Sequence, residues 1–112
     1  FEALRTAGGY DHAWVLRPGA PGALRPAATL YDPKSGRELR IATDQPAIQF
    51  YSGNFLDGSI AGKRGIHYRH RCALALETEG FPDAPNRPGF PSAVLRPGET
   101  YRHAMVHRFA SR

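Results

Sequence analysis

Hydrophobic and polar residues alternate with a period of two along most of the chain, which is the period of a half-buried β-strand and not of a helix. In residues 37–43, for example, Leu39 and Ile41 alternate with Glu38 and Arg40. Strands are predicted in this way at residues 13–16, 27–31, 37–43, 47–51, 72–77 and 101–109, the last with a helix as the alternative. Twelve glycines and ten prolines break up long helices. The pattern therefore predicts an all-β, antiparallel fold.

Two of these segments form a predicted hairpin, because the turn sequence Asp32-Pro33-Lys34-Ser35-Gly36 separates residues 27–31 from residues 37–43. In residues 72–77, alternation places Ala73, Ala75 and Glu77 on one side and the leucines on the other. The small alanines leave room for another molecule to approach Glu77. The single cysteine, Cys72, excludes an internal disulfide and is expected to be a small buried side chain of this strand.

A proline-rich loop follows the Glu77 strand. Five of the ten prolines lie between Phe81 and Pro97. Each fixes its own φ and biases the preceding residue toward extended backbone, so the loop loses little entropy on folding. The sequence therefore predicts a rigid environment next to Glu77, with Asp83 as a structural hydrogen-bonding residue in the loop.

Length and charge limit the class of protein. The 112 residues fit one domain, 1–112, and show no repeat and no second domain. The chain begins at Phe1 instead of a methionine, which favours a fragment. No apolar run approaches the roughly 18 residues that span a bilayer, and no signal-peptide pattern opens the chain, so we expect no membrane partner and a cytoplasmic location. The net charge of +5 is spread along the chain without a nucleic-acid-binding motif. Even the densest patch, residues 63–71, is expected to be a solvated face, and no nucleic-acid partner is expected.

The histidines do not predict a metal site. His103 and His107 are spaced i, i+4, which suits a shared metal ion on a helix but separates them by roughly 13 Å on a strand. His67 and His70 would point to opposite faces of a strand. With one cysteine and no dense carboxylate cluster, no metal is expected.

Four segments, in order, resemble the aldose 1-epimerase (galactose mutarotase) family. They are Gly9-Tyr10-Asp11-His12, the run from Ile48 to Gly58, Leu76-Glu77-Thr78 together with Phe81 to Asn86, and Leu95 to Tyr101. The resemblance covers essentially the whole chain but only the last third or so of a family member. It implies that residues 1–112 are the C-terminal part of a galactose-mutarotase-like β-supersandwich, an antiparallel β-sandwich.

The resemblance also implies a reaction and a set of site residues. In the family a glutamate, matched here by Glu77, takes the proton from the C1 hydroxyl of a free hexose such as galactose or glucose. A histidine protonates the ring oxygen, the ring opens, and closure gives the other anomer. Asp11 and Gln49 match residues that bind the sugar hydroxyls. The family's chemistry calls for no cofactor, and its partner is the monosaccharide substrate.

Each of these residues also has an ordinary structural interpretation. Glu77 could be a solvated carboxylate at a strand end, Asp11 a turn or capping residue, and Gln49 a partner for backbone groups inside a sheet. For Asn54 and Asp57, which flank a glycine-containing turn, the structural role is the one expected.

The chain departs from the family pattern in two respects. The general acid and a second sugar-binding histidine belong to N-terminal regions outside this chain, and His12 matches a structural position. Glu79 stands where the family commonly has glutamine. If the strand reaches it, Glu79 shares a face with Glu77 and tends to raise its proton affinity. Either the N-terminal portion or another copy of the chain would then be a partner. The alternative function is a non-catalytic carbohydrate-binding β-sandwich or an interaction fragment.

Overall fold

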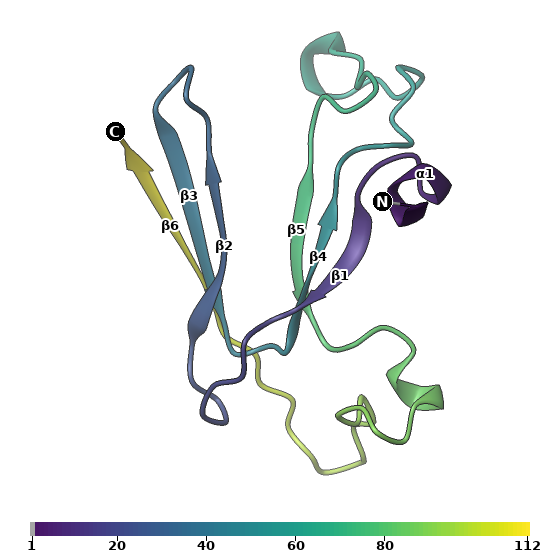
Figure 1. The fold of residues 1–112 in the computed structure, drawn as a ribbon, viewed down its shortest axis with the longest axis vertical. Coiled ribbons are helices and arrows are strands. Elements are labelled where there is room, and N and C mark those ends of the chain that lie inside the picture. The colour runs from purple at the N-terminus through teal and green to yellow at the C-terminus, as the bar shows by residue number, and fades with distance from the viewer. Residues whose placement is uncertain (1) are drawn as a thin grey trace. The chain divides into compact units, whose positions relative to one another are not determined.

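The computed structural model describes residues 2–112, so Phe1, where the predicted domain begins, lies outside the described residues. Within that range, short strands dominate and the helical segments are brief (Figure 1). The elements are α1 (Glu2–Thr6), β1 (Asp11–Val15), β2 (Arg25–Tyr31), β3 (Arg37–Thr43), β4 (Ala47–Tyr51), the 3₁₀ turn η1 (Lys63–Gly65), β5 (Ala75–Glu79), the 3₁₀ turn η2 (Ala84–Asn86) and β6 (Met105–Ser111). The strands form two three-stranded sheets, ordered β1-β4-β5 and β2-β3-β6.

The β2-β3-β6 sheet contains the predicted hairpin. β2 and β3 pair antiparallel, and β3 pairs antiparallel with β6 along its whole length. In the turn, the Asp32 carboxylate accepts hydrogen bonds from the amides of Lys34 (3.1 Å) and Ser35 (3.2 Å), and Gly36 takes a φ of 72°. A bulge interrupts β2 between Pro26 and Ala28; proline has no N–H for the ladder. The hairpin prediction is confirmed.

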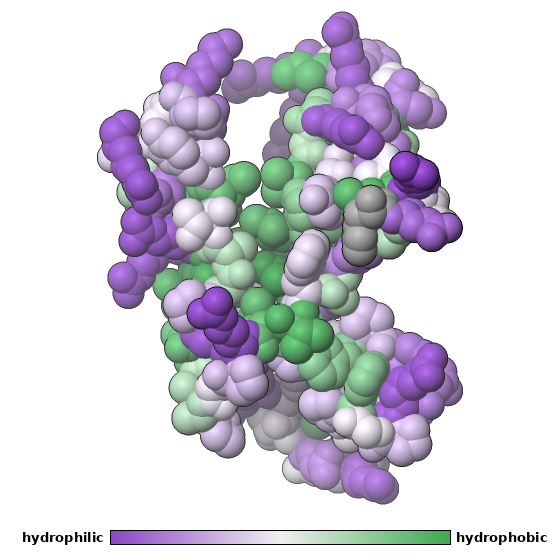
Figure 2. Space-filling view, in the orientation of Figure 1, coloured by the Kyte–Doolittle hydropathy of each residue, from purple (hydrophilic) through white to green (hydrophobic). Residues whose placement is uncertain are grey.

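The small buried core of the unit that comprises residues 15–48 and 78–112 lies on and just after β3. Ile41, Thr43, Ala47 and Ile48 are each at most 4% exposed. Many large apolar side chains elsewhere are exposed, and Figure 2 shows green apolar atoms open on the face drawn. Apolar burial within the described residues is therefore concentrated where β3 and β4 follow one another in sequence.

The β1-β4-β5 sheet is antiparallel as well. Hydrogen bonds join Ser52 N to Tyr10 O (3.0 Å) and Leu16 N to Pro46 O (2.9 Å), so residue numbers rise along β1 as they fall along β4. At the other side of β4, the Arg71 amide donates to the Gly53 carbonyl at 3.1 Å. The end of β4 therefore meets the approach to β5, and the two strands run in opposite directions (Figure 1). The predicted all-β, antiparallel class is confirmed.

Several local predictions need correction. β3 and β4 have the predicted bounds, but β5 begins at Ala75 instead of Cys72, and β6 is a strand, not a helix, that begins only at Met105. Cys72 is exposed and precedes β5 in a turn, where Arg71 has a φ of 55°, so its predicted burial is wrong. His67 and His70 lie in loops and not on opposite faces of a named strand.

The helical segments α1, η1 and η2 are short. No helix within residues 2–112 combines the length and the apolar character that crossing a membrane requires.

Candidate functional site

The structure brings two of the predicted site residues into direct contact. Asp11 opens β1, and Gln49 lies in the middle of β4. The Gln49 amide Nε2 donates a hydrogen bond to Asp11 Oδ1 at 2.7 Å. Asp11 is exposed and Gln49 half-buried. The contact leaves the second carboxylate oxygen and the amide carbonyl with the capacity to accept hydrogen bonds from a ligand such as a polyol.

The two faces of this sheet differ in character. Side chains alternate along β1, so Asp11 faces away from its neighbours Tyr10 and His12. The Tyr10 ring stacks on Phe50 at 4.9 Å between centroids and contacts the edge of His12 at 6.3 Å. The aromatic contacts stabilise one face of the sheet, and the Asp11–Gln49 pair lies on the other.

A hydrogen-bonded loop fixes the start of β1. Asn54 Nδ2 donates to the Tyr10 carbonyl at 2.8 Å, and the Ser52 hydroxyl donates to Asn54 Oδ1 at 2.7 Å. Gly9, with a φ of 151°, lies so close to these groups that a Cβ atom there would collide with Asn54 Oδ1. Asn54 therefore has the structural role that was predicted, and it holds the backbone that leads into Asp11.

Asp57 also has its predicted turn role. Its Oδ1 accepts a hydrogen bond from the Ser59 amide at 2.8 Å and another from the Ser59 hydroxyl. These bonds, led by that of the hydroxyl, hold the pKa of Asp57 below its ordinary value.

Glu77 lies in the middle of β5, the strand next to β4 in the same sheet. Its side chain is exposed and, among the described residues, makes no hydrogen bond to Asp11 or Gln49. Alternation along β5 puts Ala75 and Glu79 on the same side as Glu77. The strand does reach Glu79, as the prediction about a second carboxylate on this face required.

The loop after β5 is held by Asp83. Its backbone has a φ of 62°, and its carboxylate accepts hydrogen bonds from Asn86 Nδ2 (2.7 Å) and Arg87 Nε (2.8 Å). These contacts, first that of Asn86 and then that of Arg87, lower the pKa of Asp83. Phe81 and Phe90 meet edge to face at 5.0 Å. The predicted structural role of Asp83 is confirmed.

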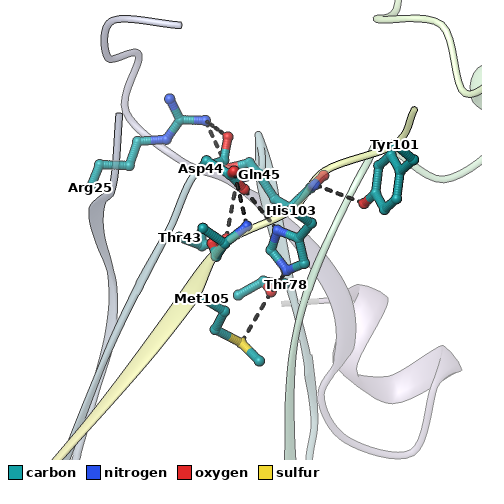
Figure 3. Close-up of polar contacts among 9 residues, drawn as sticks. Arg25, Thr43, Asp44, Gln45, Thr78, Tyr101, His103 and Met105 are labelled. Carbon is teal, nitrogen blue, oxygen red and sulfur yellow. Dashed lines mark hydrogen bonds and ion pairs between the residues drawn. The ribbon is translucent and has the colours of Figure 1, made fainter. Parts of the chain in front are cut away.

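A second polar cluster was not anticipated from the sequence (Figure 3). His103 lies just before β6, and its ring joins two other segments: Nδ1 is 2.7 Å from Asp44 Oδ1, and Nε2 is 3.1 Å from Thr78 Oγ1. Asp44 Oδ2 accepts a further bond from the Ala104 amide at 3.0 Å. The bond from His103 is the largest cause that holds the pKa of Asp44 below its ordinary value. Thr78 Oγ1 also lies 3.2 Å from Met105 Sδ.

No local signal in the sequence predicts this cluster, because Asp44 and His103 are 59 positions apart. The sequence suggested His103 only as a possible metal partner of His107, and it did not single out Asp44. His103 contacts Asp44 and His107 contacts Phe109, and within residues 2–112 no three His, Cys, Asp or Glu side chains are grouped as a metal site.

Comparison with known proteins finds one family across the chain. Residues 2–108 match the family model described as aldose 1-epimerase. Similar curated proteins include galactose mutarotase of Mus musculus, 43% identical over 102 residues, and that of Homo sapiens, 42% identical over 102 residues. Each match covers 91% of this chain and 29% of the relative. Aldose 1-epimerase of Escherichia coli K12 is 41% identical over 108 residues, covering 94% of this chain and 30% of the relative.

A solved structure shows the same likeness. The crystal structure of a GalM/aldose epimerase homologue from C. elegans superposes with a TM-score of 0.80 at 36% identity, covering 91% of this chain and 30% of that one. This confirms the predicted fold class, an antiparallel β-sandwich of the galactose-mutarotase type. The chain thus spans somewhat under a third of the length of the proteins it matches.

Proposed function

The chain belongs to the aldose 1-epimerase family, and from this premise we propose that it takes part in the interconversion of the α and β anomers of a free hexose such as galactose or glucose. In this proposal residues 1–112 are the C-terminal portion of the catalytic domain and supply the base and part of the sugar-binding site. The general acid comes from outside the chain, either from the N-terminal portion or from another copy. No cofactor takes part.

The contact between Asp11 and Gln49 is the observation that carries the proposal. Two polar side chains that are 38 positions apart in the sequence meet at 2.7 Å on adjacent strands. Their contact fixes the rotamers of both, so the remaining acceptor and donor groups have defined directions before a ligand arrives. Vicinal sugar hydroxyls, each both donor and acceptor, suit such a carboxylate–amide pair.

The position of Glu77 supports its proposed role as the general base. It is exposed, so a sugar hydroxyl can reach it, and it projects from a strand instead of a mobile chain end. Gly53 lies just after β4, accepts a bond from the Arg71 amide and lies against the Ala73 carbonyl, so it aligns β4 with the residues that lead into β5. Counting from Gly53 and Ala73, four residues back along β4 and four residues on along β5, brings Gln49 level with Glu77. This count supports a single site containing all three side chains.

The chemistry then follows from the residue types. The Glu77 carboxylate takes the proton from the C1 hydroxyl as the C1–ring-oxygen bond breaks, and the acid gives a proton to the ring oxygen. Rotation about C1–C2 and the reverse transfers close the ring as the other anomer. Asp11 and Gln49 hold the hydroxyls of the sugar so that C1 stays next to Glu77. General base catalysis of this kind contributes about 10²- to 10⁴-fold to a rate.

Polarimetry of freshly dissolved α-D-galactose and α-D-glucose tests the proposal. In the presence of the portion that supplies the acid, the protein should accelerate the change in optical rotation, and Glu77→Gln, which keeps the size of the side chain, should lower the acceleration by about 10²-fold or more. Glu99→Gln is the matched control, because Glu99 is an exposed loop residue whose carboxylate accepts a bond from the Arg96 amide, and it should leave the rate unchanged.

Sugar binding separates the two candidate functions. If galactose shifts the NMR resonances of Asp11 and Gln49 but mutarotation is not accelerated even in the presence of the portion that supplies the acid, the chain is a carbohydrate-binding module and the catalytic proposal is wrong. If Glu77→Gln accelerates mutarotation as well as the wild type does, Glu77 is not the base.

A further inference from the structure

His103 connects three segments that are far apart in the sequence. Its Nδ1 contacts Asp44, which follows β3, and its Nε2 contacts Thr78 in β5 (Figure 3). The side chains of His103 and Asp44 are only 23% and 17% exposed. The Ala104 amide holds the second oxygen of Asp44 at 3.0 Å, and the Asp44 amide donates to the Ala104 carbonyl at 3.2 Å. Asp44 therefore holds the imidazole at Nδ1, and the Nε2 atom of the same ring contacts Thr78.

The proton positions follow from this arrangement. An ionised carboxylate only accepts hydrogen bonds, so the proton on His103 lies on Nδ1 and is donated to Asp44. In the neutral ring, Nε2 then accepts a bond from the Thr78 hydroxyl. If the ring is protonated, Nε2 donates to Thr78 instead, and the Thr78 hydroxyl donates to Met105 Sδ, 3.2 Å away. The link between His103 and Thr78 persists in both states of the ring.

Thr78 is the residue next to Glu77, and the two side chains project from opposite faces of β5. A threonine side chain has few χ1 rotamers, so a hydrogen bond to its Oγ1 restrains the backbone that carries it. Restraint at Thr78 is transmitted through one peptide bond to Glu77. His103 therefore fixes β5 from the face opposite to the carboxylate.

We propose that His103, held by Asp44, is a positioning residue that sets the orientation of Glu77 through Thr78. The inference rests on the proposed function in that Glu77 is taken as the base. His103 does not touch the sugar; it restricts the movement of the strand from which the base projects. A displacement of about 1 Å in a catalytic group is enough to cost about 10²-fold in rate, so a small loss of restraint is measurable.

Removal of the Thr78 hydroxyl is the sharpest perturbation. Thr78→Val keeps the β-branched shape and removes the hydroxyl that bonds to His103, and Thr78→Ser keeps the hydroxyl. His103→Gln breaks the same link from the other side. His107→Gln is the matched control: it makes the same substitution four residues along the chain, at an exposed strand position whose ring contacts Phe109.

The first measurement is ¹³C NMR of protein labelled in its glutamate side chains, because it does not depend on activity. We expect Thr78→Val and His103→Gln to shift the Glu77 carboxyl resonance and to lower the order of its side chain, with Glu99 unchanged as an internal reference. Thr78→Ser and His107→Gln should leave Glu77 as in the wild type. An unchanged Glu77 in both folded variants, Thr78→Val and His103→Gln, would overturn the proposal.

The second measurement is the polarimetric rate. Thr78→Val should lower kcat about 10-fold with KM changed less than 2-fold, because the sugar contacts of Asp11 and Gln49 remain, and Thr78→Ser should recover most of kcat. A rise in KM with kcat unchanged would contradict a role in positioning the base. If the wild type shows no mutarotation even with the portion that supplies the acid, the proposed function fails on that result, and the NMR comparison alone decides whether His103 orients Glu77.

Discussion

Glu38 offers the largest expected change in stability from a single charge. It lies in β3, is 3% exposed, and forms ion pairs with Arg40 and Arg112. Arg112 also lies over the Tyr31 ring, 5.4 Å from its centroid, and its amide donates to the Gly36 carbonyl at 2.9 Å. The Glu38 carboxylate therefore links the end of the chain after β6 to β3. Glu38→Gln keeps the shape of the side chain and removes the charge that both guanidinium groups contact.

The expected loss of unfolding free energy depends on how deeply the carboxylate and the two guanidinium groups are buried. Removing one partner of a fully buried ion pair costs about 3–5 kcal/mol, and an exposed pair contributes only about 0–1 kcal/mol. Here the carboxylate side chain is 1% exposed, but the arginine side chains are 60% and 56% exposed. Water can therefore solvate both guanidinium groups after the substitution. We expect an intermediate loss of about 2 kcal/mol in the free energy of unfolding.

Urea unfolding followed by circular dichroism measures this loss. With an m-value of about 1–3 kcal/mol/M, the midpoint should fall by about 1 M, and the melting temperature should fall by about 8 °C. Glu2→Gln, at an exposed position of α1, is the control and should stay within about 0.5 kcal/mol of the wild type. A Glu38→Gln midpoint equal to that of the wild type would show that desolvation of the carboxylate cancels both ion pairs and would refute the reasoning.

Two further predictions concern the polar clusters. Because the hydrogen bond from His103 lowers the pKa of Asp44 in the folded state, Asp44 adds stability at neutral pH that is lost as the pH falls through that lowered pKa. The difference in unfolding free energy between the wild type and Asp44→Asn should therefore shrink as the pH is lowered from 7 to 3. A difference that stays constant over this range would contradict the lowered pKa of Asp44. Gly9→Ala should destabilise the protein by about 1–3 kcal/mol in urea unfolding, because φ is 151° and the added Cβ meets Asn54. Gly80→Ala, where nothing lies within 4 Å of the added atom, should not.

Much of the fold is readable from local sequence. The alternation in residues 37–43 and 47–51 predicted two strands with the bounds that the structure has, and the Asp32 turn predicted the hairpin of residues 37–43 with the preceding strand, β2. Four motifs in order were enough to predict the family and its fold class. The strand and hairpin predictions were correct because side-chain alternation and turn chemistry are properties of neighbouring residues.

Where the prediction failed, the deciding contacts are distant in sequence. The apolar residues around Cys72 suggested a strand, but Arg71 adopts a left-handed conformation and donates its amide to Gly53, so β5 begins three residues later. Periodicity alone cannot detect such a turn, because the hydrogen bond that stabilises it comes from another segment.

The sequence by itself determined that six segments form strands, with the observed bounds for β3 and β4, and which family the chain belongs to. The proximity of Asp11 to Gln49, and the contacts of His103 with Asp44 and Thr78, were decided only by the tertiary structure. A hydrogen bond across 38 or 59 positions depends on strand order and register, and these are set by the packing of the whole sheet.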